Sequence, residues 1–525
     1  MNCYNSNYDF NEYSNVKNIK NVQKYADEVE LNEYYHNNHP VKNGVINSPY
    51  YFVKVNGKEV KTYATRSAHG IHSFVYISVE NDINFNLKVE VFSKEHSTFL
   101  KNSIPEVDVL PLSNNIKAQV EQGRVCFSVS KLGSYSLAFN QQHLEPITVF
   151  ITKKDKLNEL FGDYQIQYIN PDDYSTVEKR SLTEFTKENT VYYFKKGKYV
   201  IDRISLPSNS ILYLENGAYL EIVPSKYFGK NEAIFVHHAY NVKFAGRGII
   251  DFSACCGGET ASKKLFQNKS GIMIRDSMDI EFTGITIVNC SSWTLNFVDC
   301  ERVHVKNVMI YGYRVFSDGI MLSDCVNGLV EDCFVRTGDD AFEVKSIGVV
   351  NFTDNVLFRN NAAWTDKAQA YGSIYECNHG TKNVRFENCS VGFALATWSD
   401  HVSCCVIQLG NLPNRVVEDI HFKNIEIYKT INASALNLHI GGTGSSYFGY
   451  GIIDNIYFEN ITIKHNAGAV LRLRTSDDKN CKIGRVYLKN IINEGEKFTQ
   501  QSLNDPKLFI NRVVGGYDTS KIEVK

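Results

Sequence analysis

Long hydrophobic runs are missing from this sequence: no stretch of its 525 residues approaches the roughly 18 apolar residues that cross a membrane. The N-terminal segment, MNCYNSNYDFNEYSNVKN, is polar and has no apolar signal region. Excess charge is also missing, since the net charge is -2 and the sequence pI about 6.7. We therefore expect no nucleic-acid or membrane partner. We expect a cytoplasmic location, or secretion if a signal peptide has been removed.

Metal-binding cysteine spacing is likewise missing, because no CxxC occurs among the 13 cysteines. Several cysteines, such as Cys300, Cys325 and Cys333, fall at the ends of strand-like runs, where we expect reduced thiols packed as small apolar groups. We expect neither a metal nor a cofactor. Helical periodicity is almost missing too, which excludes a barrel of alternating strands and helices.

The sequence is long enough for two domains, and its first part is rich in short alternating runs. Examples are YYFVKV at 50–55 and SFVYISV at 73–79, each followed by turn residues. Such runs predict an N-terminal β-sandwich over residues 1–152. A charged connector is expected over residues 153–190.

An internal repeat begins near residue 191. Its units include DIEFTGITI at 279, DIHFKNIEI at 419 and NIYFENITI at 455, and each unit contains a second strand-like run. Two or three short strands per unit, with Asn at the turns, are typical of a right-handed parallel β-helix. A propeller would need four strands per unit with hairpin turns. The predicted fold is therefore all-β, with a β-helix over residues 191–525.

Three aspartates stand at the starts of two such runs, SDGIML at 317–322 and DDAFEV at 339–344. If the runs are neighbouring rungs in register, Asp318 lies beside Asp340, and Asp339 is one residue away. Acidic residues before strands are common in ordinary turns. Crowded carboxylates raise the cost of ionising one another, however, so this arrangement favours a role in proton transfer.

The outward side chains of the second runs predict a polar strip with the roughly 4.8 Å spacing of β-rungs, suited to a chain of hydroxyl groups. We place in one outward column Asn296, Met321, Glu343, Glu376, Gln408, His439 and Arg472. Lys345 belongs to a flanking column. Trp364 and Trp398 fall in predicted loops on the groove side, where each could stack on a sugar ring or close the coil core. The expected substrate-binding residues are Lys345, Glu343, Glu376, Trp364, Gln408, His439 and Arg472.

Cleavage of a glycosidic bond needs a proton donor and a carboxylate that acts on water or on the sugar. We expect Asp339 to be the acid, with a pKa raised by its neighbours and by partial burial. Asp318 and Asp340 would stay ionised and hold the attacking water, which gives inversion. The expected partner is a polysaccharide or oligosaccharide substrate.

At these aspartates, in SDGI at 317–320 and TGDDAFEVK at 337–345, the sequence resembles the β-helical glycoside hydrolases of families 28 and 49. These are the polygalacturonases and the dextranase–isopullulanase group. The likeness to family 49 extends to the N-terminal sandwich, to VYYFKKGKYV at 191, and to Trp364 and VIQLGN at 406–411. The resemblance implies an inverting hydrolase of an α-glucan such as dextran.

Two motifs of the polygalacturonases have poor counterparts in this sequence. In place of Gly-His-Gly stands HGT at 379–381, and in place of the uronate-binding Arg-Ile-Lys stands LRLR at 471–474. These departures favour a neutral glycan. The alternatives are a polygalacturonase-like pectin hydrolase, a β-helix polysaccharide lyase in which Lys345 is the base, and a non-catalytic glycan-binding protein.

Overall fold

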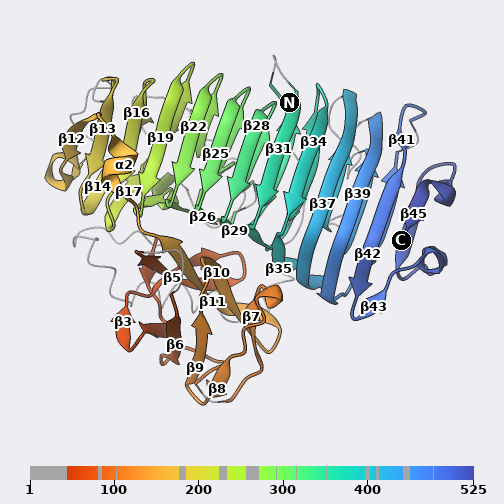
Figure 1. The fold of residues 1–525 in the computed structure, drawn as a ribbon, viewed down its shortest axis with the longest axis horizontal. Coiled ribbons are helices and arrows are strands. Elements are labelled where there is room, and N and C mark those ends of the chain that lie inside the picture. The colour runs from red at the N-terminus through yellow and green to blue at the C-terminus, as the bar shows by residue number, and fades with distance from the viewer. Residues whose placement is uncertain are drawn as a thin grey trace.

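The computed structural model describes residues 44–525 except 81–84, 102, 177–184, 224–232, 256–270, 291, 315, 349–351, 396–402, 410–412, 442–449 and 477. Trp398 and the first 43 residues lie outside this part. A long right-handed parallel β-helix lies beside a smaller β-sandwich (Figure 1). The predicted fold class is confirmed. Within the described residues, no helix has the length and apolar character needed to span a membrane.

The sandwich has two sheets because its short strands bury alternate side chains between them, as in the alternation of buried and half-buried residues in β2. The six-stranded sheet contains, in order, β1 (Ile46–Asn47), β4 (Tyr63–Ser67), β5 (Gly70–Val79), β11 (Gln142–Lys153), β10 (Gly133–Phe139) and β7 (Val107–Leu110). The five-stranded sheet contains β3 (Lys58–Val60), β2 (Tyr51–Val55), β6 (Leu87–Ser93), β9 (Arg124–Val129) and β8 (Gln119–Glu121).

Each coil of the β-helix contributes short parallel strands to three faces, which we name A, B and C. Face A consists of β15 (Ile204–Ser205), β18 (Ile234–His237), β21 (Ile272–Arg275), β24 (Leu295–Val298), β27 (Ile320–Ser323), β30 (Phe342–Ser346), β33 (Tyr371–Cys377), β36 (Ser403–Leu409), β38 (Ser434–Ile440), β40 (Leu471–Thr475) and β44 (Phe509–Arg512). Face B consists of β14 (Gly197–Ile201), β17 (Ala218–Ile222), β20 (Ile249–Asp251), β23 (Thr286–Val288), β26 (Met309–Tyr311), β29 (Phe334–Thr337), β32 (Ala362–Thr365) and β35 (Ser390–Leu395).

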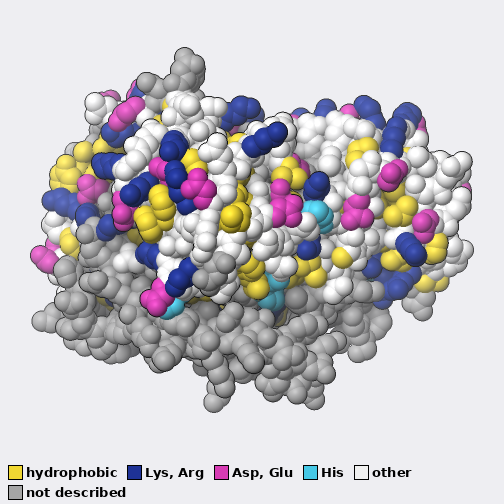
Figure 2. Space-filling model, turned by 90° about the horizontal axis from the view of Figure 1, so that it is seen from below, with side chains coloured by type: hydrophobic (Ala, Val, Ile, Leu, Met, Phe, Trp, Pro, Cys, Tyr) yellow, Lys and Arg dark blue, Asp and Glu magenta, His cyan; other side chains and the backbone are white. Residues whose placement is uncertain are grey.

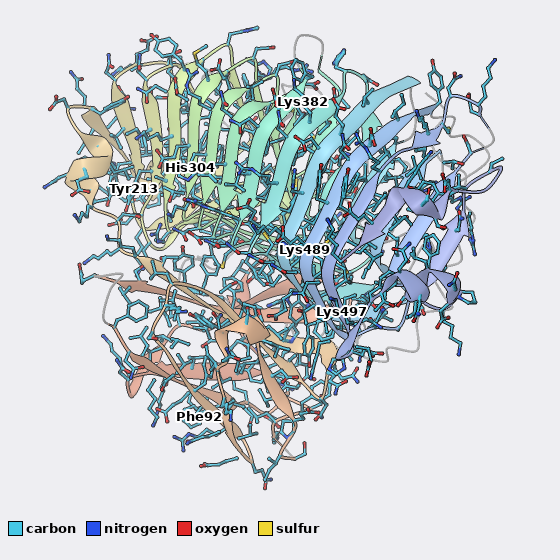
Figure 3. The ribbon with its side chains drawn as sticks, turned by 45° about the vertical axis from the view of Figure 1, so that its right-hand side comes forward. Phe92, Tyr213, His304, Lys382, Lys489 and Lys497 are labelled. Carbon is cyan, nitrogen blue, oxygen red and sulfur yellow. The ribbon has the colours of Figure 1, made fainter. Side chains whose placement is uncertain are left out.

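Face C consists of β12 (Gln165–Ile169), β13 (Thr190–Phe194), β16 (Ser210–Leu214), β19 (Tyr240–Gly246), β22 (Met278–Thr283), β25 (Glu301–Lys306), β28 (Val326–Glu331), β31 (Thr353–Arg359) and β34 (Thr381–Glu387). Three long strands cross from face C to face B, namely β37 (Pro413–Ile431), β39 (Tyr450–His465) and β42 (Val486–Asn493). The C-terminal end adds β41 (Lys482–Ile483), β43 (Glu496–Lys497) and β45 (Ile522–Val524). His304, Lys382 and Lys489 mark successive parts of face C, and Phe92 marks the sandwich (Figure 3).

The interior of the coils is filled by stacked apolar side chains, because residues at the same place in successive rungs lie one above another. Phe358, Phe386, Phe422 and Phe458 form such a stack, with ring centroids 4.8, 4.9 and 5.1 Å apart. Within the described residues the helices are short: α2 (Leu157–Phe161) and 3₁₀ turns at Leu112–Asn114, Pro171–Tyr174, Ser253–Cys255, Gln500–Asn504 and Thr519–Lys521. Part of the predicted connector is thus built into the β-helix, because β12 pairs with β13.

Face B carries the sandwich (Figure 1). Large apolar side chains point outward from this face and pack against the sandwich, among them Tyr311, Phe334 and Trp364, which meet Phe74 and Phe150. Basic and acidic side chains intermingle over the face seen from below (Figure 2). The segments that lead from face B to face A therefore lie next to the sandwich.

Candidate active site

The three aspartates lie in two of the segments that connect face B to face A. Asp318 precedes β27, and Asp339 and Asp340 precede β30. These strands pair in register, Ile320 with Phe342, and the Gly319 amide donates to the Asp340 carbonyl at 2.7 Å. Asp318 therefore stacks beside Asp340 on the next rung, as the alternation in the sequence predicts.

The carboxylates divide into a close group and a separate member. One oxygen each from Asp318, Asp340 and Glu343 lies within 4.8 Å of the others, and all three side chains are buried. Asp339 stands outside this group. Its Oδ2 accepts from the Phe316 amide at 2.8 Å, and its Oδ1 accepts from the Asp340 amide at 3.1 Å. Asp318 and Asp340 are thus close enough to hold one small molecule between them, while Asp339 is held apart by backbone amides.

Burial controls the protonation of this cluster. It raises the pKa of Asp318 and of Asp340 well above the usual range, and the charges of Asp339 and Glu343 raise both further. Burial also raises the pKa of Asp339, but the Phe316 amide opposes the rise. Burial raises the pKa of Glu343 to about 7. All three aspartates thus have raised pKa values, and the rise is largest at Asp318 and Asp340, which were expected to stay ionised and which have less hydrogen-bond support than Asp339.

Lys345 and Lys367 are the lysines whose charges act on the aspartates, Lys367 on Asp339, and two carboxylates already hold Lys345. Its Nζ lies 3.1 Å from Glu343 Oε2 and 2.9 Å from Glu376 Oε2, and it donates to the Ile374 carbonyl at 3.2 Å. Burial alone would lower the pKa of Lys345, but Glu343 and Glu376 raise it well above its usual value. The lysine is thus protonated, and the two carboxylates balance its charge.

A bulge in β33 changes the predicted outward column. Val344 pairs with Ser373, but Ser346 pairs with Cys377, and Tyr375 within the bulge has φ 60°. Glu376 is shifted from the side of Glu343 to that of Lys345. The column through Glu343 continues instead with Gly372, which precedes the bulge, and then with Val406, Asn437 and Arg472. The prediction that Glu376, Gln408 and His439 belong to it is wrong.

Gln408 and His439 instead lie in the neighbouring outward column of face A, which continues to Arg474, and form a buried row there. Gln408 Oε1 accepts from Gln369 Nε2 at 3.2 Å, and Gln408 Nε2 lies 3.2 Å from His439 Nδ1. The backbone amide of Gln369 donates to Asp340 Oδ1 at 2.9 Å. The row therefore supports the segment that holds Asp340.

The predicted tryptophan is in the wrong place for a sugar platform. Trp364 lies within β32 on face B and is only 2% exposed, with its ring between His72 and Phe393 of the domain interface. Trp293, which is half-buried, lies beside the site, with Lys345 Nζ 5.6 Å from its ring centroid. Trp293 was not predicted from the sequence. It could have been found from its position, because it precedes β24, the strand that pairs with β27, just as Asp318 precedes β27.

A comparison with protein-family models decides which family this is. Residues 196–500, more than half of the chain, match the model for glycosyl hydrolases family 28. The chain belongs to this family. It is a glycoside hydrolase.

Curated relatives of this family 28 hydrolase share modest identity. An exopolygalacturonase of Arabidopsis thaliana, clone GBGE184, is 24% identical over 201 residues, which are 37% of this chain and 43% of the relative. A probable polygalacturonase of Vitis vinifera is 26% identical over 137 residues, 25% of each chain. The chain spans less than half the length of these relatives.

Among solved structures, Dex49A from Penicillium minioluteum aligns with a TM-score of 0.64 and 13% identity over 94% of this chain and 97% of its own. That likeness shows a shared fold over both domains.

The acidic limb of the pH profile should depend on Glu343 in this family 28 hydrolase. A water-activating carboxylate must be ionised, so activity should fall as the pH drops through the raised pKa values of Asp318 and Asp340. Glu343→Gln removes a neighbouring charge and frees Lys345 to stabilise the ionised aspartates. We expect the acidic limb of kcat/KM to move to lower pH. Glu376→Gln is the control. Glu376 also pairs with Lys345 but does not belong to the close group of Asp318, Asp340 and Glu343, so this variant should shift the acidic limb less. An unmoved limb in Glu343→Gln would contradict this coupling.

Proposed function

We propose that this glycoside hydrolase cleaves the α-glycosidic bonds of a neutral polysaccharide or oligosaccharide, an α-glucan such as dextran, with inversion. The observation that carries the proposal is the neutralisation of Lys345 by Glu343 and Glu376. A uronate beside Asp318 and Asp340 would need a cation of its own, and Lys345 already has two carboxylate partners.

The division of the carboxylates supports a role for each aspartate. In this proposal Asp318 and Asp340, which lie in the close group, hold the attacking water between them. Asp339, which stands apart, protonates the leaving oxygen, and the Phe316 and Asp340 amides orient it. An inverting pair needs its carboxyl groups about 6.5–9.5 Å apart to admit water, which suits an acid outside the close group.

The charges along face A also support a neutral sugar at the point of cleavage. Glu343 adds a buried carboxylate within the group formed by Asp318 and Asp340. Arg472, the basic residue in the same outward column, lies four rungs further on. At the usual strand spacing this is roughly 19 Å, too far to meet a uronate at the cleaved bond.

The lyase alternative has less support. A lyase needs a neutral Lys or Arg to remove a proton next to a uronate. Glu343 and Glu376 raise the pKa of Lys345, after the opposing effect of burial, and so keep the lysine protonated.

Polygalacturonate hydrolysis is the second candidate, and the names of the curated relatives favour it. The purified chain should be incubated with dextran, other neutral α-glucans and polygalacturonate, and reducing ends measured. We expect release from a neutral glucan and little from polygalacturonate. The Asp318→Asn variant is the control for contaminating activity. Cleavage of polygalacturonate alone would overturn the proposal for a neutral substrate and leave the hydrolase assignment intact.

A further inference from the structure

We propose that the hairpin between β4 and β5 of the sandwich, residues 66–69, is a positioning element of the catalytic site. It contacts two segments that lead from face B to face A, which we name the first loop (312–314 and 316–317) and the second loop (366–369). Each loop supplies a backbone amide to a catalytic aspartate. This inference rests on the proposed roles of the aspartates and adds a function for the sandwich.

The first loop lies between the hairpin and Asp339. The guanidinium of Arg66 stands 4.3 Å from the centroid of the Tyr313 ring. Three residues later, the Phe316 amide donates to Asp339 Oδ2. Phe316 has φ 70°, a conformation that a bulky residue adopts only when its surroundings impose it. The loop also packs tightly on the segment of Asp339, since a Cβ at Gly338 would lie 2.4 Å from the Arg314 carbonyl oxygen.

The second loop lies between the hairpin and Asp340. The Ala68 amide donates to Asp366 Oδ2 at 3.1 Å, and His69 Nε2 lies 3.1 Å from the Asp366 carbonyl oxygen. Three residues later, the Gln369 amide donates to Asp340 Oδ1 at 2.9 Å. In each loop the hairpin thus contacts a residue near the start, and an amide three residues later in the same loop donates to a catalytic carboxylate.

The second loop is also tied to Asp339. The Asp366 amide donates to the Thr337 carbonyl at 2.9 Å, and Thr337 Oγ1 donates to the Asp339 carbonyl at 2.7 Å. A shift of Asp366 would therefore reach both aspartates of the pair at 339–340.

Docking of the two domains does not by itself require these polar contacts. The apolar cluster on face B already joins sandwich and β-helix. Hydrogen bonds further along the interface join them too, such as that from Tyr428 to Asp108 Oδ2 at 2.6 Å. The contacts of Arg66, Ala68 and His69 fall on the two loops at the site, which points to positioning.

The test is the double variant Arg66→Met/His69→Ala in the full chain, assayed on whichever glycan the wild type cleaves. Looser loops should weaken the amide hydrogen bonds to Asp339 and Asp340. We expect kcat to fall by at least about tenfold with KM within about twofold, because orientation is lost without loss of substrate contacts. The acidic limb of kcat should also move to higher pH, because the ionised carboxylates lose support.

Two controls separate positioning from docking. Tyr428→Phe removes a bond across the same interface away from the aspartates and should leave kcat and the pH limb unchanged. Arg66→Met/His69→Gln keeps a side-chain donor near the Asp366 carbonyl and should recover part of kcat.

A lower melting temperature with unchanged kcat and pH limb in the double variant would overturn the inference. If that variant does not fold, the single variants His69→Ala and His69→Gln are compared by kcat and by the acidic limb. The inference expects a lower kcat in His69→Ala than in His69→Gln, and equal values would overturn it. The roles of the aspartates are tested separately by their own variants, so either proposal can fail alone.

Discussion

Asn in place of Asp318, Asp339 or Asp340 should lower turnover of the polymer by at least about two orders of magnitude, the usual scale of acid–base help. Asp318→Asn and Asp340→Asn remove a carboxylate from the pair that holds the water. Asp339→Asn removes the proton donor. Initial rates of reducing-end release measure all three. Asp354→Asn, an aspartate of β31 on face C, is the matched control and should keep nearly full activity.

A substrate with an activated leaving group separates the roles. Such a leaving group needs no protonation, so Asp339→Asn should retain most of its activity on that substrate. Asp318→Asn and Asp340→Asn should stay inactive on it, because the water still has to be activated. Full activity of Asp339→Asn on polymer would show that the acid is another residue.

Loss of the Asp366 carboxylate should strongly destabilise the protein. This carboxylate holds Arg336 through a hydrogen bond of 2.9 Å from Nη2, and both side chains are only 1% exposed. Asp366→Ala would leave a buried guanidinium without its counter-charge. Removal of one partner of such a pair typically costs about 3–5 kcal/mol. Urea unfolding followed by fluorescence measures the change.

The control for this prediction is Asp279→Asn, which removes the charge from an ion pair with Arg302 and suits the left-handed φ of 56° at this position; the Asp279 and Arg302 side chains are 47% and 45% exposed. Exposed pairs contribute about 0–1 kcal/mol, so the loss should be small. Burial opposes ionisation of Asp366, yet Arg336 lowers its pKa below the usual value. Its stabilising effect should therefore be full above the pKa of the unfolded chain and be lost as the pH falls through the folded pKa. Equal losses in both variants would contradict the assigned role of the buried pair.

The pairing of Asp318 with Asp340 could be predicted because alternation fixes which side chains share a face, and two ungapped runs fix the register. The bulge in β33 could not be predicted. It is made by Tyr375 at φ 60°, and no Gly or Asn in that position signals a left-handed residue. Glu376, Gln408 and His439, which lie within or beyond it, were therefore assigned to the wrong column.

The sequence contains a sign that Trp364 is buried, but the alternation of apolar and polar residues does not reveal it. Outward positions of the face B strands β26, β29 and β32 carry Tyr311, Phe334 and Trp364, large apolar groups that a solvated face would not bear, although Arg336 lies between Tyr311 and Trp364 in their column. They indicate a covered face, and the sandwich is the cover. Strand patterns say nothing of which face a second domain occupies, so its position beside the aspartates emerged only from the structure.

The anomeric configuration of the first product tests the central claim most directly. Proton NMR of a freshly cleaved α-linked glucan should show the β-anomer first, because water held by Asp318 and Asp340 attacks from the side opposite the bond that Asp339 protonates. Initial release of the α-anomer would mean retention through a covalent intermediate, and would contradict the assignment of Asp318 and Asp340 as the residues that hold the water.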